Sequence, residues 1–306
     1  MQKTMLNQRK AIILGILVVL FWSTVSSAFK LGLNYLPPAL LLLYSAITSA
    51  IALLIVIIFQ GKFISIFNYG KKQYINAFLT GLLNPFIYFI FLFKAYYLLP
   101  AQEAQAITYT WPISMTILAI IILKQKFSKI DIAASFICYL GILIIITHGH
   151  IENIHFSNIF GILFALTSTV IWSVYWIINT KQKSDPIINL FLNFIFALPL
   201  ILIYCYFFTG IKFSYTGFLW AAYVGLFEMG IAFVLWLYAL KYAENKTVII
   251  NLTYLTPLLA LFFINILTGE KILNSTIIGI LIILLGIIIQ NKFHNKNKKN
   301  KLLNPK

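Results

Sequence analysis

Apolar runs of roughly membrane-spanning length follow one another along the whole chain, separated by short polar breaks that contain lysine. A helix needs about 20 apolar residues to cross a bilayer. Backbone groups cannot stay unpaired in lipid, so the runs are predicted to be helices. The sequence therefore predicts an all-α membrane protein with ten transmembrane helices, at about 11–30, 37–59, 74–95, 99–122, 130–147, 157–178, 187–208, 216–239, 247–267 and 275–291.

Composition and charge agree with a membrane protein. Hydrophobic residues make up 61% of the chain and charged residues 10%, whereas a soluble domain carries about 25% charged residues. The net charge is +16, and 19 of the 23 Lys and Arg fall on one side of the predicted membrane. Lysine in short loops marks the cytoplasmic side. We therefore expect a multi-pass protein of a bacterial plasma membrane, embedded in the lipid bilayer, with both termini cytoplasmic and no nucleic-acid partner.

The two halves of the chain resemble each other at offsets of 144 and 145 residues. The matched pairs are Tyr109 with Tyr254, Pro112 with Pro257, Gly141 with Gly286, and Asn84 with Glu228. Each half holds five predicted spans, and because five is odd the second half must enter the membrane from the opposite side. We expect two inverted five-helix repeats, at 1–147 and 157–291, and a basic cytoplasmic tail at 292–306.

One carboxylate lies deep in an apolar span. Glu228, in GLFEMG, is about a dozen residues from either polar end of its run. At about 1.5 Å per helical residue, each end is about 18 Å away, beyond the reach of the side chain. A carboxylate at this depth needs a partner, a proton or a wet cavity. Its match Asn84 lies at the same depth, and Pro85 and Gly230 are expected to kink the two helices.

Polar side chains gather on spans 1, 3 and 4 and on their counterparts 6, 8 and 9, which we expect to line a central cavity. The candidate substrate-contacting residues are Glu228, Asn84, Trp22, Ser23, Ser26, Gln105, Tyr109, Trp172, Ser173, Asn251 and Tyr254. Glu228 and Glu103 are the candidates for proton coupling, because burial favours the protonated form of a carboxylate. The alternative is that the Ser residues only pack helices and that Trp22 and Trp172 anchor the chain at the interface.

The segment LTPLLALFFINILTGEKI, residues 255–272, resembles the EamA-type members of the drug/metabolite transporter superfamily. In that family spans 4 and 9 carry a Pro, and the span ends in Glu followed by Arg or Lys. Pro257 with Glu270 and Lys271 fits this pattern, while the first repeat has Gln125 in place of the Glu. The resemblance implies a carrier of small metabolites, often amino acids or related compounds, with a cavity between the repeats.

These observations favour a secondary transporter that moves a small metabolite by alternating access, with export coupled to a proton gradient. An importer or exchanger of a nucleotide-like or sulfonium metabolite is the alternative within transport. A membrane-embedded enzyme is the second alternative, but the chain has no HExxH or GxSxG motif and no intramembrane Asp pair. We expect no catalytic residue, no metal site and no cofactor.

Overall fold

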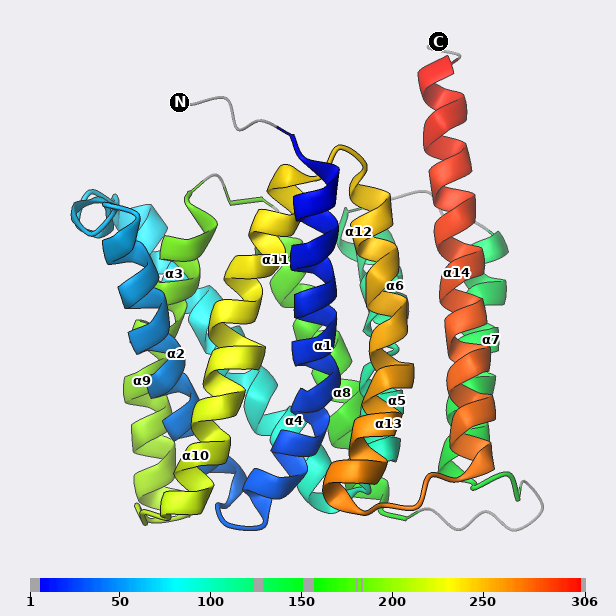
Figure 1. Cartoon of the computed structure of the whole chain (residues 1–306), viewed down its shortest axis with the longest axis horizontal. Helices are drawn as coiled ribbons and strands as arrows, with labels where there is room; N and C mark the ends of the chain where they lie inside the picture. The colour runs from blue at the N-terminus through cyan, green and yellow to red at the C-terminus, as the bar shows by residue number, and fades with distance from the viewer. Residues whose placement is uncertain (1–5, 124–128, 151–156, 180, 183, 304–306) are drawn as a thin grey trace.

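The computed structural model describes residues 6–123, 129–150, 157–179, 181–182 and 184–303. Helices make up nearly all of this part of the chain (Figure 1). The elements are α1 (Gln8–Leu33), α2 (Pro38–Phe59), η1 (Ile64–Ile66), α3 (Lys71–Gly81), η2 (Leu82–Ile87), α4 (Tyr88–Leu98), α5 (Ala101–Thr108), α6 (Trp111–Leu123), α7 (Lys129–Ile146), α8 (Ile159–Asn179), α9 (Pro186–Phe208), α10 (Tyr215–Val224), η3 (Gly225–Gly230), α11 (Ile231–Tyr242), α12 (Lys246–Leu252), η4 (Thr253–Leu255), α13 (Thr256–Thr268) and α14 (Asn274–Leu303).

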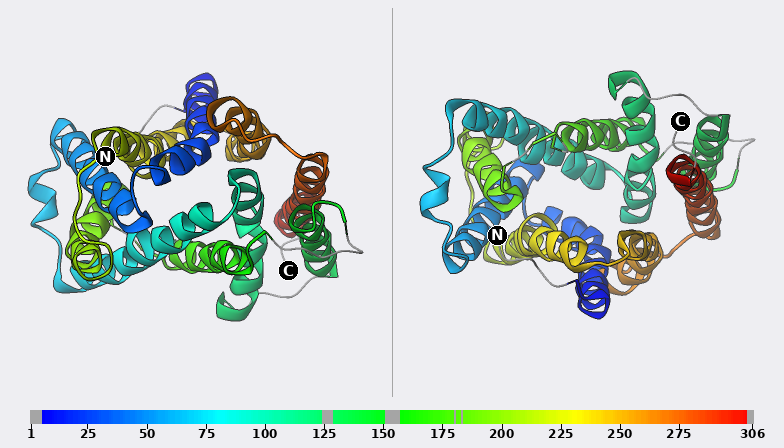
Figure 2. Two further views of the ribbon diagram at one scale, coloured as in Figure 1. Left: turned by 90° about the horizontal axis from the view of Figure 1, so that it is seen from below. Right: turned by 90° about the horizontal axis from the view of Figure 1, so that it is seen from above.

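The ten predicted spans are present, and the all-α membrane architecture is confirmed. Eight are helical stretches long and apolar enough to cross a bilayer, within the residues described. The remaining two, in α7 and α14, have shorter apolar stretches, at Ala133–Ile146 and Asn274–Ile289. These two helices pack against each other along one side of the helix bundle (Figure 2). The predicted tail remains helical through Leu303 as a continuation of α14.

Four spans are interrupted, in two matched pairs. Spans 3 and 8 each contain a π-helical turn, η2 and η3, so the kinks expected beside Pro85 and Gly230 are confirmed. Spans 4 and 9 are broken where the sequence predicted continuous helices: α5 gives way to α6 around Tyr109, and α12 to α13 through η4. Pro112 and Pro257 lie just after these breaks, because proline lacks the amide that would continue the helical hydrogen bonds.

The two halves interleave rather than stand side by side. Helix α1 packs against α10, α11 and α13 of the second half, and α8 packs against α4, α5 and α6 of the first. Large contacts also pair α2 with α9 and η3, α3 with α9, and α7 with α14. Figure 1 shows both termini at one end of the molecule, called here the termini face. The start of α1 bonds to the end of α11 there, from Asn7 N to Tyr242 O at 2.8 Å.

The start of α8 lies at the other end, called here the opposite face, where Gly161 packs against Leu98 and Leu99 at the end of α4. The two halves thus begin on opposite faces of the molecule, as an inverted pair does. Each helix is therefore held mainly by contacts with helices of the other half, and a movement of one half must repack nearly every interface.

Small residues set the closest approaches between the halves. A Cβ at Gly81 would lie 2.5 Å from the carbonyl oxygen of Asn193 in α9, and a Cβ at Gly225 would clash with the carbonyl of Ser45 in α2. Gly81 and Gly225 are 144 residues apart, the same offset as Asn84 and Glu228. Gly81 directly precedes η2 and Gly225 is the first residue of η3, and each lets the backbone there touch the backbone of a helix from the other half.

Candidate functional site

Glu228 lies in the η3 turn, and its side chain is only half-buried. Among the described residues it has no hydrogen-bond or ion-pair partner. Tyr88 and Tyr96 of α4 lie within electrostatic range of its carboxylate. A mid-span carboxylate that retains accessible surface and lacks a partner is typical of a group that faces a water-filled cavity, and not of one that forms a structural ion pair.

Asn84 occupies the equivalent place in η2 but is more deeply buried, with 3% of its surface exposed. The backbone leaves helical geometry at this residue, with φ −143° and ψ 115°. Its side chain approaches the hydroxyl of Tyr175 in α8, while its Oδ1 has no partner in the part of the chain that the structure describes. An unpaired buried carbonyl costs free energy unless a water or a ligand completes it.

Aromatic rings from both halves form a connected group, called here the aromatic cluster. Phe233 of α11 is 6.0 Å, centroid to centroid, from both Trp22 of α1 and Trp172 of α8. Tyr88 stacks on Trp172 at 4.7 Å, and Trp176 stacks on Phe233 at 6.4 Å. The sequence-predicted pair Trp22 and Trp172 is therefore brought together by a residue that the sequence analysis did not single out.

Two of the predicted polar residues meet directly. The hydroxyl of Ser26 in α1 donates to Gln105 Oε1 in α5. The hydroxyl of Tyr96 lies 2.7 Å from the same oxygen and 3.0 Å from Ser26 Oγ. We call Ser26, Gln105 and Tyr96 the polar triad. It joins α1, α4 and α5, and through Tyr96 it lies within electrostatic range of Glu228.

Ser23 and Ser173 join helices at the proline breaks. Ser23 Oγ donates to Val19 O at 2.6 Å and lies 3.4 Å from Thr256 O, the residue before Pro257. Ser173 Oγ lies 3.2 Å from Trp111 O, the residue before Pro112. The two serines make equivalent contacts in the two halves, which is the helix-packing alternative that the sequence left open for them.

Three further predicted residues lie on the broken helices. Tyr109 donates its hydroxyl to Thr253 O, so the two breaks touch each other. Tyr254 is half-buried and packs against the core. Asn251, on α12, is exposed.

Glu103 lies at the opposite face, at the start of α5. Its carboxylate accepts from His148 Nε2 at 2.8 Å and from Ser157 Oγ at 2.5 Å, and it is 1% exposed. It thus fastens α5 to His148, which follows α7, and to Ser157, which precedes α8. The described part of the chain holds no group of three or more His, Cys, Asp or Glu placed to bind a metal ion.

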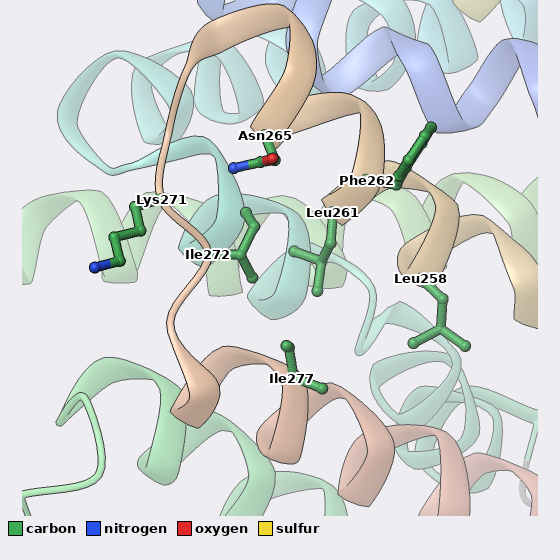
Figure 3. A pocket seen from close by; sticks show the side chains of 7 residues that line it. All are labelled: Leu258, Leu261, Phe262, Asn265, Lys271, Ile272 and Ile277. Atoms are coloured by element: carbon green, nitrogen blue, oxygen red, sulfur yellow. The ribbon is translucent and has the colours of Figure 1, made fainter.

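The structure contains two notable hollows. One, of about 150 Å³, opens at the termini face between α8, α9 and α11 and reaches the aromatic cluster at Trp176 and Phe233. The other, of about 440 Å³, lies between α13 and α14, with side chains of both helices turned into it (Figure 3). Its walls include Leu258 and Phe262, which are 36% and 58% exposed, so it faces outward rather than toward Glu228.

The residues that the sequence analysis missed are Tyr88, Tyr96 and Phe233. They are aromatic residues among many apolar ones, so composition gives them no distinction. A signal existed in the repeat: Phe89 and Phe233 are matched at the offset of 144 residues that also matches Asn84 with Glu228. The same offset could have directed the search for functional residues to the helical turn that follows each kink.

Comparison with known proteins decides the family. The sequence profile of the EamA-like transporter family matches the chain twice, at residues 9–147 and 159–291. The chain belongs to the EamA-like transporter family. The double match agrees with a duplicated repeat, and membership makes this EamA-like protein a multi-pass membrane transporter rather than an enzyme.

Individual relatives match most of the length of this EamA-like chain. It is 25% identical over 293 residues to the uncharacterized transporter YoaV of Bacillus subtilis, covering 94% of this chain and 99% of the relative. It is 23% identical over 262 residues to the aromatic amino acid exporter YddG of Ancylobacter novellus, covering 83% and 88%. A protein of known crystal structure shares the fold, with a TM-score of 0.66 at 20% identity, over 95% of this chain and 99% of that one.

Proposed function

We propose that this transporter is a secondary carrier that exports a small metabolite bearing an amino group, an amino acid or a related compound, in exchange for protons. The two repeats, 1–147 and 157–291, would alternately expose the site to each side of a bacterial plasma membrane. Both termini would be cytoplasmic, as the distribution of lysines favours. The observation that carries the proposal is the half-buried carboxylate of Glu228 in a mid-span π-helical turn, which has no hydrogen-bond or ion-pair partner in the part of the chain that the structure describes.

The chemistry of exchange follows from a single carboxylate with two possible partners. On the cytoplasmic side Glu228 would give up its proton and bind the ammonium group of the substrate. On the outer side a proton would displace the substrate, because the neutral acid has no charge with which to hold an ammonium ion. The carboxylate is then never left charged and alone in the membrane, which would cost several kcal/mol.

The aromatic cluster supports a substrate that carries an apolar or aromatic group. Trp22, Trp172, Trp176 and Phe233 present ring faces and edges from both halves of the chain. Rings of this kind stack on aromatic groups and also attract cations. The relative YddG is an exporter of aromatic amino acids by its name, so aromatic amino acids and aromatic amines are the first compounds to test.

The test uses purified protein in sealed vesicles loaded with radiolabelled tryptophan, phenylalanine or an aromatic amine. An inward proton gradient should accelerate efflux through the native protein. Glu228→Gln should abolish the response to the gradient. Glu244→Gln removes an exposed carboxylate of the linker after α11 and should behave as the native protein does. Gradient-driven efflux that persists in Glu228→Gln would remove this carboxylate from the mechanism, and gradient-driven uptake would favour an importer.

A further inference from the structure

At the opposite face, a carboxylate from the second repeat accepts hydrogen bonds from the first turn of α5 and holds this turn in place. Helix α5 begins after Pro100, which offers no side chain to cap it. Glu270, in the linker between α13 and α14, supplies the missing acceptor. Its Oε1 accepts from Ala101 N at 2.9 Å and its Oε2 from Gln102 N at 3.3 Å. A carboxylate is a strong acceptor for these first-turn amides, and the helix dipole strengthens the contact.

Gln102 closes the same junction from the other direction. Its Nε2 donates to Lys271 O at 3.1 Å. Its Oε1 accepts from Leu273 N at 3.1 Å and from Thr276 Oγ1 at 2.9 Å. Gln102 is 5% exposed and Thr276 is fully buried, whereas Glu270 is half-buried at the edge of the junction. We call Glu270, Gln102 and their partners the α5 clamp.

The clamp and the site share one short helix. Gln105 of the polar triad is one turn further along α5 than Ala101, on the same face. A movement of the first turn of α5 therefore moves Gln105 with it. The nearby Lys30 donates to Tyr96 O and Leu99 O at the end of α4, so the neighbouring helix is fastened at the same face.

Helix α12, which corresponds to α5 in the second half, has a more exposed first turn than α5. At the offset of 145 residues, Ala101 and Glu103 match Lys246 and Val248 in the first turn of α12. The first pair is at most 1% exposed, whereas Lys246 is exposed and Val248 is 39% exposed. The termini face is also where the 150 Å³ hollow reaches the aromatic cluster. The structure thus combines a closed junction on one face with an opening on the other.

We propose that Glu270 is a positioning residue for transport: it holds α5 against the second repeat and must release Ala101 and Gln102 before the site can open to the opposite face. This inference rests on the proposed alternating access. It assigns part of the stability of the closed state to a carboxylate outside the site, and removal of that carboxylate should favour the conformation that is open to the opposite face.

Thiol labelling in sealed vesicles tests the proposal without any substrate. Both native cysteines are buried, so the parent protein is the blank. Ala101→Cys reports on the opposite face, because this residue is fully buried when the clamp is closed. Asn179→Cys reports on the termini face, because this residue lines the 150 Å³ hollow. Each reporter is combined with Glu270→Ala, with Glu270→Gln, or with the control Glu244→Ala, and a membrane-impermeant thiol reagent is applied from each side.

With Glu270→Ala, labelling of the first reporter should rise and labelling of the second should fall, so that the ratio of the two rises about tenfold, since a charge-assisted hydrogen bond shifts a two-state equilibrium by at least that factor. Glu270→Gln keeps one acceptor and should give an intermediate shift. If labelling rises at both reporters, the substitution has loosened the whole structure. If labelling is unchanged at both, Glu270 does not stabilise the closed state. Either result overturns the proposal. A reciprocal shift without proton-driven efflux would instead leave the clamp standing and refute proton exchange.

Discussion

The two π-helical turns, η2 and η3, share a backbone form and differ in their side chains. Each has a glycine at or directly before its first residue that touches a helix of the other half, and both interrupt a span at the same depth. One carries Asn84, 3% exposed, and the other carries the half-buried Glu228. Helix packing requires the interruption in both halves, whereas the carboxylate is present in only one. The shared feature therefore belongs to the fold, and the unshared one is the better candidate for function.

A second comparison concerns the first turns of α5 and α12. These turns match in sequence position but not in burial, because α5 is clamped by Glu270 while the start of α12 is exposed. Two similar five-helix units in two different environments are what alternating access requires, since exchange of the two environments opens the other face.

The largest expected effect comes from making the two turns alike. Glu228→Asn gives η3 the side chain of η2, and proton-driven efflux should fall about a hundredfold or more, equivalent to a loss of ~2.7 kcal/mol. Asn84→Ala should lower efflux less than about tenfold, because its Oδ1 has no partner to lose among the residues that the structure describes. Rates of labelled efflux from vesicles with matched protein content measure both. Equal losses in the two variants would show that the turns are functionally equivalent.

The two glycines where the π-helical turns begin should be equally intolerant of a side chain. Gly81→Ala and Gly225→Ala each place a Cβ against a backbone carbonyl of α9 or α2. Each should lower stability by about 1–3 kcal/mol, as overpacking does. The midpoint of thermal unfolding of the purified protein measures the effect. Gly70→Ala is the matched control, because a Cβ there meets nothing closer than 3.7 Å. A strong effect at only one of the two glycines would mean that the halves are not held in the same way.

The smallest expected effect concerns the serines at the proline breaks. Ser23→Ala and Ser173→Ala each remove one contact to the carbonyl before Pro257 or Pro112. Each should cost about 0.6 kcal/mol, the average for a polar side chain between membrane helices. Thermal unfolding should show similar small shifts, with efflux unchanged. A large loss of efflux in either variant would return that serine to the substrate site.

Much of this architecture was predictable from the sequence. The ten spans, the odd number of spans in each half and the kinks at Pro85 and Gly230 follow from local properties, namely apolar run length and proline or glycine chemistry. The breaks in spans 4 and 9 were signalled by Pro112 and Pro257, but a proline fixes only that a helix is disturbed. Whether it bends or separates into two helices depends on the carbonyls around it, such as those that Ser23 and Ser173 contact.

The sequence by itself determined that the chain crosses a membrane as two related halves and that one carboxylate, Glu228, lies far from water along its own helix. Only the tertiary structure decided which side chains share a site. Phe233 links Trp22 to Trp172, Gln105 meets Ser26, and Glu270 caps a helix about 170 residues earlier in the chain. Contacts of this kind depend on how the two halves interleave, and in lipid the hydrophobic pattern is nearly uniform around each helix, so the sequence does not reveal which face meets which.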